Sequence, residues 1–239
     1  MKYQAIFKRF EIKFILSGQQ MVFIKERMQP FMRGDSYGKT SIRNLYYDTD
    51  CYHLIRRSCE KPIYKEKLRV RSYGAVDCDG SVFVELKKKF DKIVYKRRVV
   101  LPERQAMDWL SGSMSAPDVS QITAEIDYFL HYYNGLAPRV YLSYDREAYL
   151  SEADPQLRVT FDENIQFRCN KLSLLEEPGG YSLLGDNEYL MEIKASGGIP
   201  MWLAHALSEA KIYKTSFSKY GVAYQRMIYP QLKGALFHV

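Results

Sequence analysis

Cysteine and histidine are scarce in this sequence of 239 residues, which contains four of each. No two cysteines form a CxxC pair, and no spacing of cysteine and histidine matches a zinc site. The cysteines are Cys51, Cys59, Cys78 and Cys169. We therefore expect free thiols and ordinary imidazoles, and the spacing offers no Cys/His or Ser/His nucleophile.

Long apolar runs are also missing. No segment is long and apolar enough to span a membrane, and the N-terminal stretch MKYQAIFKRFEIKF lacks the apolar core of a signal peptide. These two absences favour a cytoplasmic location. A GxxxxGK[ST] loop is absent as well, which argues against a P-loop nucleotide enzyme.

Positive charge is in excess, with 35 Lys and Arg residues against 28 Asp and Glu residues and a net charge of +7. Such a balance favours an anionic partner, which could be nucleic acid, an anionic membrane surface or phosphate-rich small molecules. The hydrophobic content of 46% is ordinary for a globular protein. Because strand patterns resume on both sides of each Gly/Ser/Pro-rich loop, we expect a single domain over residues 1–239.

Strand patterns dominate the chain and helical patterns lie between them, which predicts an α+β fold that is mainly β. The predicted strands are Phe7–Ile15, Ser41–Asp48, Lys65–Tyr73, Ser81–Phe90, Lys92–Leu101, Pro138–Tyr149, Leu157–Asp162 and Glu188–Ala195. The predicted helices are Gly18–Phe31, Pro102–Leu110, Ser120–Tyr133 and Pro200–Ile212.

The stretch KEKLRVRSYG shows the feature that recurs in nearly every predicted strand. Side chains of a strand alternate between its two faces, so the basic residues share one face while Leu68 and Val70 take the other. The polar members of these faces are Lys65, Lys67, Arg69 and Arg71; Arg9, Glu11 and Lys13; Glu85 and Lys87; Lys96 and Arg98; Tyr144 and Arg146; Arg158, Thr160 and Asp162; Glu192 and Lys194.

One such face is usually solvated, but a series of them suggests a closed sheet with its charged face inside. Buried cations need partners, and arginine and lysine suit phosphate oxygens. The carboxylates Glu11, Glu85 and Glu192 either hold Mg²⁺ or Mn²⁺ together with phosphate or form ion pairs with neighbouring strands. Likewise, Asn44, Tyr46 and Asp48 either touch a nucleotide or acceptor or make structural hydrogen bonds.

The ordered series RFEIKF, NLYYDTD, KEKLRVR, ELKKK, VYKRRV, YDREAY, LRVTFDENI, MEIKAS and SFSKYG resembles the catalytic domain of the vacuolar transporter chaperone (VTC) polyphosphate polymerases. These are triphosphate tunnel metalloenzymes, relatives of the CYTH triphosphatases, and the resemblance runs from about Phe7 to Tyr224. It implies a closed antiparallel eight-stranded β-barrel with helices packed outside. The implied activity is metal-dependent phosphoryl transfer from ATP, or another nucleoside triphosphate, to a growing inorganic polyphosphate chain.

By match to the family's motifs, the resemblance also implies the site residues. The implied catalytic residues are Arg69, Arg71, Lys87, Arg146 and Lys219. Those implied to bind substrate phosphate are Arg9, Lys13, Lys67, Lys96, Arg98, Tyr144, Arg158, Lys194 and Ser218. Glu192 matches the glutamate that holds Mn²⁺ or Mg²⁺, and Glu11 is a second candidate ligand.

One departure from the family's relatives bears on the reaction. The CYTH hydrolases begin with ExExK, whereas this sequence has Arg9 in place of the first glutamate, a pattern that resembles the polymerases. Two alternatives stay open: a tripolyphosphate or nucleoside triphosphate hydrolase of the same fold, and a non-catalytic module that binds polyphosphate or RNA. The leading interpretation expects no nucleic-acid partner. It allows a membrane partner, because the eukaryotic polymerases also carry a membrane region that this sequence does not contain.

Overall fold

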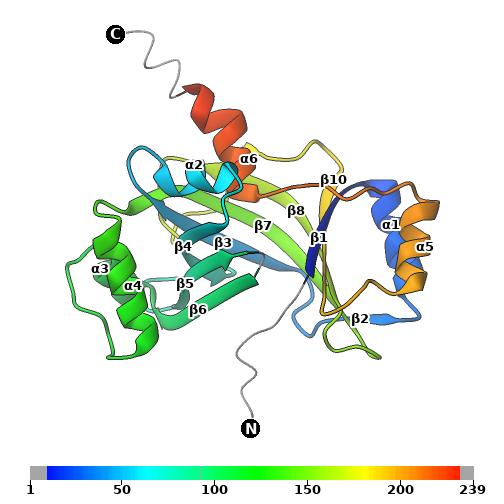
Figure 1. Ribbon diagram of the computed structural model, residues 1–239, viewed down its shortest axis with the longest axis horizontal. Coiled ribbons are helices and arrows are strands. Elements are labelled where there is room, and N and C mark those ends of the chain that lie inside the picture. Colours follow the sequence, from blue (N-terminus) through cyan, green and yellow to red (C-terminus); the bar gives the residue numbers. More distant parts are fainter. Residues whose placement is uncertain (1–9, 92, 232–239) are drawn as a thin grey trace. The chain divides into compact units, whose positions relative to one another are not determined.

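The computed structural model describes residues 10–91 and 93–231 (Figure 1). The chain divides into two compact units, each made of three stretches of sequence. The first unit comprises Met1–Thr40, Tyr144–Ile165 and Leu184–Ser218, and the second comprises Ser41–Ser143, Gln166–Leu183 and Lys219–Val239. The expectation of a single domain stays a prediction.

All eight predicted strands and all four predicted helices have counterparts among the described residues, with ends shifted by up to six residues, while residues 7–9 and 92 of the predicted strands lie outside the described residues. The strands are β1 (Phe10–Ser17), β2 (Met32–Gly34), β3 (Thr40–Asp48), β4 (Tyr64–Tyr73), β5 (Ser81–Phe90), β6 (Ile93–Pro102), β7 (Ala137–Ser151), β8 (Arg158–Arg168), β9 (Tyr181–Ser182) and β10 (Glu188–Ala195). The helices are α1 (Gly18–Met28), α2 (His53–Cys59), α3 (Glu103–Leu110), α4 (Gln121–Tyr132), α5 (Met201–Glu209), α6 (Lys219–Ala223) and the π-helix η1 (Tyr224–Ile228).

The strands pair in the order β1-β10-β8-β7-β3-β4-β5-β6, with β2 added on β7 and β9 on β8. In the part of the chain that the structure describes, β1 and β6 end this order without pairing to each other, so the sheet is open. The expectation of a closed eight-stranded barrel is therefore wrong. The outer edge of β1 is instead occupied by another segment of its own unit, where the Thr215 backbone N–H donates to the Lys13 carbonyl at 2.7 Å.

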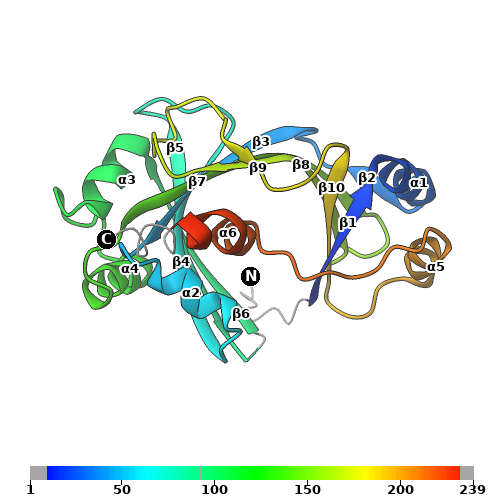
Figure 2. The ribbon, with the colours of Figure 1, turned by 90° about the horizontal axis from the view of Figure 1, so that it is seen from above.

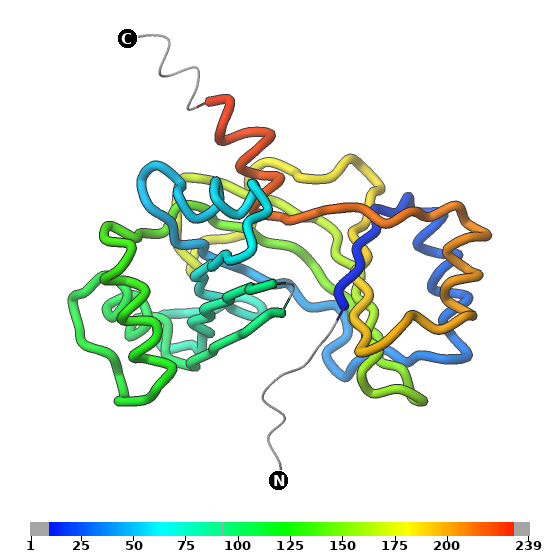
Figure 3. The backbone as a smooth tube through the Cα atoms, in the orientation of Figure 1, coloured from blue at the N-terminus to red at the C-terminus, as the bar shows by residue number. Residues whose placement is uncertain are grey.

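In the first unit, the alternation of β1 and β10 turns one face of the sheet toward two helices. Phe14 and Leu16 of β1 and Met191 and Ile193 of β10 are buried in one apolar cluster with residues of α1 and α5. The two helices come from distant parts of the sequence and run side by side, as the tube in Figure 3 makes clear. Ser17 begins α1 with a capping box. The opposite face of β1 and β10 is left for charged side chains.

In the second unit, the meander of β4, β5 and β6 buries its apolar face against α3 and α4 (Figures 1 and 2). Leu68, Val84 and Leu86 from the strands are fully buried there and belong to one cluster with Trp109 of α3 and Ile126 of α4. Burying side chains of this size supplies most of the favourable free energy of folding. It also fixes the register of each strand, because a shift by one residue would turn the charged side chains inward.

Helix α2 was not predicted, and its start depends on Asp48. The residue at the N-cap position, Tyr52, has a left-handed backbone and contributes no capping side chain. The Asp48 carboxylate accepts from the backbone N–H of Leu54 at 2.9 Å and of Ile55 at 3.0 Å. It also accepts from the Tyr220 hydroxyl at 2.9 Å. Asp48 is thus a structural hydrogen-bond acceptor, the second of its two expected roles.

None of the helices within residues 10–91 and 93–231 is both long enough and apolar enough to cross a membrane.

The role of Asp48 can be tested by the substitution Asp48→Ala. The change leaves three backbone donors, those of Thr49, Leu54 and Ile55, and one hydroxyl without their acceptor, so we expect the free energy of unfolding to fall by roughly 2 kcal/mol or more. Urea denaturation measures the difference. Asp50→Ala is the matched control, because Asp50 is exposed and its carboxylate accepts only from the neighbouring Cys51 N–H among the hydrogen bonds of the described residues. Equal losses for the two variants would contradict this role.

Candidate functional site

The polar face of the second unit is organised in cross-strand rows. The register places Tyr46, Arg69, Glu85 and Arg98 side by side on β3, β4, β5 and β6. A neighbouring row consists of Lys67, Lys87 and Lys96. A third row begins with Asn44 and Arg71. The sequence predicted which residues share this face, and the register now shows which of them are direct neighbours.

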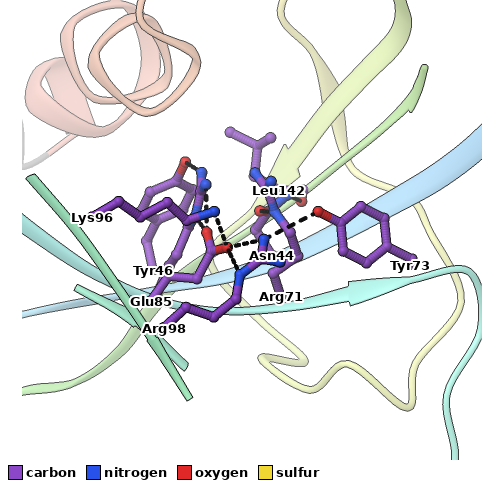
Figure 4. A network of polar contacts seen from close by, with 9 residues as sticks. Asn44, Tyr46, Arg71, Tyr73, Glu85, Lys96, Arg98 and Leu142 are labelled. Atoms are coloured by element: carbon purple, nitrogen blue, oxygen red, sulfur yellow. Dashed lines mark hydrogen bonds and ion pairs between the residues drawn. The ribbon is translucent and has the colours of Figure 1, made fainter. Parts of the chain in front are cut away.

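Glu85 holds three cations of this face. Its side chain is only 1% exposed. One carboxylate oxygen accepts from Arg69 Nε at 2.8 Å and Nη2 at 2.7 Å, and the other accepts from Arg98 Nε at 2.8 Å and pairs with Lys96 Nζ at 2.6 Å. Figure 4 shows the Lys96 and Arg98 side chains pointing toward this carboxylate. Burial would raise the pKa of Glu85, but the surrounding cations hold it well below its usual range.

Cations nevertheless remain in excess on these rows. Glu85 is the one carboxylate on the polar sides of β4, β5 and β6 among the described residues, against eight basic side chains. They are Lys65, Lys67, Arg69, Arg71, Lys87, Lys89, Lys96 and Arg98. Like charges directly across a ladder are destabilising, and burial together with nearby arginines lowers the pKa of Lys96 despite Glu85. An anion with several oxygens would offset this repulsion.

Asn44 and Tyr46 extend the rows onto β3. Asn44 is fully buried; its amide donates to the Leu142 carbonyl at 3.0 Å and accepts from Arg71 Nε at 2.9 Å. This makes Asn44 a structural residue that orients Arg71. Tyr46 accepts from Arg69 Nη1 at 3.0 Å. Burial alone would raise the pKa of Tyr46, but the charges of β4 lower it to about 8.

In the first unit, a second cluster lies on the face of the sheet opposite α1 and α5. Lys13 Nζ lies 3.2 Å from a carboxylate oxygen of Glu11 and 3.2 Å from one of Glu192, and it donates to the Phe217 carbonyl at 2.9 Å. Although burial would lower the pKa of Lys13, Glu192 and Glu11 raise it above its ordinary value. Lys13 is therefore protonated at neutral pH and forms ion pairs with both carboxylates.

Arg146 continues this cluster onto β7. Its guanidinium binds the fully buried Asp162 carboxylate through Nε and, at 2.7 Å, through Nη2, and Nη2 also lies 3.4 Å from Glu192. The Arg146 guanidinium stacks 5.1 Å from the centre of the Tyr144 ring. The chain of charges from Glu11 to Asp162 is nearly balanced in sign. In contrast to the second unit, this cluster combines carboxylates and cations in similar number.

The other residues implied by the resemblance lie at different places. Arg158 pairs with Asp35 at 3.4 Å, and its register neighbour on β10 is Lys194, which in turn lies opposite Glu11 of β1. Ser218 is an exposed residue at the end of the first unit, and Lys219 begins α6 in the second. Arg9 lies outside the described residues.

Sequence reasoning missed the full importance of two carboxylates. Asp162 was seen to share a face with Arg158 and Thr160, yet it is the residue that holds Arg146. Glu85 was expected either as a metal ligand or in an ion pair, and the structure places it in ion pairs with three cations. The i and i+2 charge pattern marked both residues. Their partners come from other strands, so only the register could identify them.

The carboxylates of the first unit fit a hard divalent cation. In the described residues, no group of three or more His, Cys, Asp or Glu side chains is placed to hold a metal by itself. Mg²⁺ and Mn²⁺, however, commonly take one or two carboxylates and complete their shell with water and phosphate oxygens. Glu11 and Glu192 already share one cation, the Lys13 ammonium. The buried Thr160 hydroxyl, directly opposite Glu192 on β8, has no hydrogen-bond partner in the part of the chain that the structure describes.

Comparison with known proteins identifies the family. The model of the VTC domain matches residues 8–228, which is nearly the whole chain. The chain belongs to the VTC domain family. This VTC domain is 25% identical over 205 residues to vacuolar transporter chaperone complex subunit 4 of Schizosaccharomyces pombe. The match covers 77% of this chain but only 26% of that protein, so the chain spans about a quarter of its relative's length.

Solved structures share the fold of this VTC domain. A protein from Hippeastrum, reported as an adenylyl cyclase with a dominant triphosphatase activity, aligns over 89% of this chain and 93% of its own with a TM-score of 0.56 and 17% identity. A protein from Bacillus halodurans named as an adenylate cyclase aligns over 90% and 96% with a TM-score of 0.54 and 16% identity. At these identities the likeness concerns the fold alone. The family resemblance expected from the sequence is confirmed.

The ion pairs of Glu85 predict a pH-dependent loss of stability in Glu85→Gln. Its lowered pKa means that ionised Glu85 stabilises the fold above the ordinary pKa of 4.5, and that this stabilisation is lost as the pH falls through the lowered value. Removing the charge should cost about 3 kcal/mol at pH 7. The difference between wild type and variant should shrink as the pH falls below 4.5, as urea denaturation at several pH values would show. A difference that does not change with pH would contradict the assignment.

Proposed function

We propose that this VTC domain transfers a phosphoryl group from ATP to the end of an inorganic polyphosphate chain in a reaction that requires a divalent metal. The observation that carries the proposal is the excess of cations on the polar face of the second unit, where the described residues of β4, β5 and β6 place eight basic side chains beside one carboxylate. Such a face suits a chain of phosphates better than any neutral ligand. Membership in the family supports the same substrate class.

In this proposal the second unit binds and orients phosphate. Arg69 and Arg98 are held by Glu85, so their planar donors are fixed before substrate arrives. Fixed donors that match phosphate oxygens lower the barrier by positioning the reactants and by neutralising charge on the transferring group. Lys67, Lys87 and Lys96 add point charges beside them. No side chain has to form a covalent intermediate, because an oxygen of the acceptor phosphate attacks the γ-phosphorus of ATP directly while the bond from that phosphorus to the β-phosphate oxygen breaks and ADP leaves.

In the first unit, Glu192 and Glu11 would hold the metal. A divalent cation bound there would neutralise charge on phosphate oxygens. Lys13 holds the two carboxylates close together, because its ammonium contacts both. Arg146, fixed by Asp162, contributes a further oriented guanidinium. We assign Arg146 the role of binding phosphate while Asp162 positions it.

Hydrolysis is the second candidate reaction, with water as the acceptor. The observation that favours this alternative is the triphosphatase activity reported for the Hippeastrum protein, which shares the fold. Arg9 favours the polymerase, since it replaces a glutamate that the CYTH hydrolases have at this position. The two reactions use the same phosphate-binding groups and differ in the acceptor that reaches the γ-phosphate.

The products distinguish these reactions. Purified protein would be incubated with ATP and Mn²⁺, and the phosphate products would be resolved on a gel. Chains longer than the triphosphate are the expected result. Free phosphate alone would establish the hydrolase instead. The absence of turnover together with tight binding of polyphosphate would show a binding module and contradict both enzymatic proposals.

The metal role of Glu192 predicts the effect of Glu192→Gln. The change removes the charge of a candidate ligand but keeps its size, so we expect turnover of ATP to fall by roughly a hundredfold or more. Glu147→Gln is the matched control. Glu147 is also a paired carboxylate of the first unit, bonded to Lys25 at 2.7 Å, and it does not belong to the cluster around Lys13. Similar rates for Glu192→Gln and wild type would contradict the role.

A further inference from the structure

Three side chains of β3 point to the polar face of the second unit, and one of them has an unused donor. Asn44 and Asp48 are fully engaged in structural hydrogen bonds. The Tyr46 hydroxyl accepts from Arg69 Nη1 at 3.0 Å, but no acceptor for its own proton is found among the described residues. Tyr46 is only 8% exposed. A buried hydroxyl of this kind normally donates to a partner.

Within residues 10–91 and 93–231, the groups around Tyr46 provide cations and no unused acceptor. Lys67, Arg69 and Arg71 act on it from β4, and the Glu85 carboxylate of β5 is engaged by Arg69. From α6, the Tyr220 ring packs 4.8 Å from the Tyr46 ring. The Tyr220 hydroxyl donates to Asp48, which is therefore already used as an acceptor. A free donor surrounded by three cations is an arrangement suited to an anionic oxygen.

We propose that the Tyr46 hydroxyl donates a hydrogen bond to an oxygen of the phosphate that Arg69 binds. Ionisation of Tyr46 at alkaline pH then weakens the binding of phosphate. The inference rests on the proposed function, because it assigns the phosphate to the cationic rows of the second unit. It adds Tyr46 to the residues that the resemblance implied to bind substrate phosphate. It also makes Tyr46 the residue whose ionisation changes the affinity for phosphate with pH.

The direction of the pH effect follows from the charges. Burial opposes ionisation of Tyr46, whereas Arg69, Lys67 and Arg71 favour it strongly enough to lower its pKa to about 8. Below that value the phenol can donate. Above it the phenolate has no proton to donate and repels the bound anion, so affinity for phosphate must fall as the pH rises through this value. A bound phosphate in turn raises the pKa of Tyr46 by reciprocal linkage.

Calorimetric titration with inorganic tripolyphosphate between pH 6.5 and pH 9.5 tests this proposal on the whole chain. Wild type should lose affinity by about tenfold for each pH unit above 8. At pH 7, Tyr46→Phe should bind roughly tenfold to a hundredfold more weakly than wild type. It should also lack the alkaline loss, apart from a shallow decline as lysines titrate in both proteins.

The matched control is Tyr73→Phe. Tyr73 accepts from an arginine of the same network, Arg98, at 3.3 Å, but it is 45% exposed (Figure 4). This variant should keep the wild-type break near pH 8. If Tyr46→Phe shows the same break as wild type, the inference is wrong while the proposed function stands. If wild type fails to bind tripolyphosphate at any pH, the proposed function itself fails.

Phenolate absorbance gives a second measurement that needs no variant to fold. At pH 8.5, addition of tripolyphosphate to wild type should return Tyr46 to its neutral form and lower the phenolate absorbance. No change in absorbance at saturating tripolyphosphate would overturn the inference.

Discussion

The alternation of side chains along each strand is the constraint on which this molecule depends. Apolar residues at one parity are buried under helices in both units, and residues of the other parity bring charge to the opposite face. Core packing therefore specifies the position of every functional side chain on the strands. Shifting β4 by one residue would bury Arg69 and expose Leu68. The register that buries the apolar residues of β4 is therefore also the one that places its basic residues on the polar face.

The cluster around Glu85 in the second unit and the cluster around Lys13 and Arg146 in the first unit differ in how their like charges are compensated. In the second unit, Glu85 holds three cations, yet the lysine row beside it still favours an added anion. In the first unit, Lys13 and Arg146 are balanced by carboxylates, an arrangement that suits a cation brought in together with its phosphate ligand.

Much of this architecture could be predicted from the sequence because it depends on local periodicity. The eight strands, four helices and the polar face of each strand follow from spacing alone. The start of α2 could not be predicted, since its capping carboxylate, Asp48, lies outside the helix and Tyr52 at the N-cap gives no signal. The partners of Glu85 and Asp162 depend on cross-strand register. The closed barrel was expected from the family resemblance, and no local pattern could show that Thr215 occupies the edge of β1.

The central claim, that strand parity sorts basic residues into phosphate ligands and structural ion pairs, is tested most directly by two adjacent arginines of β6. Arg98 pairs with Glu85 on the polar face, whereas Arg97 pairs with Glu125 of α4 on the other. Calorimetric titration with tripolyphosphate at pH 7 should show binding weakened by about tenfold or more in Arg98→Ala. It should be unchanged in Arg97→Ala. Equal losses in the two variants, or a loss confined to Arg97→Ala, would contradict the account.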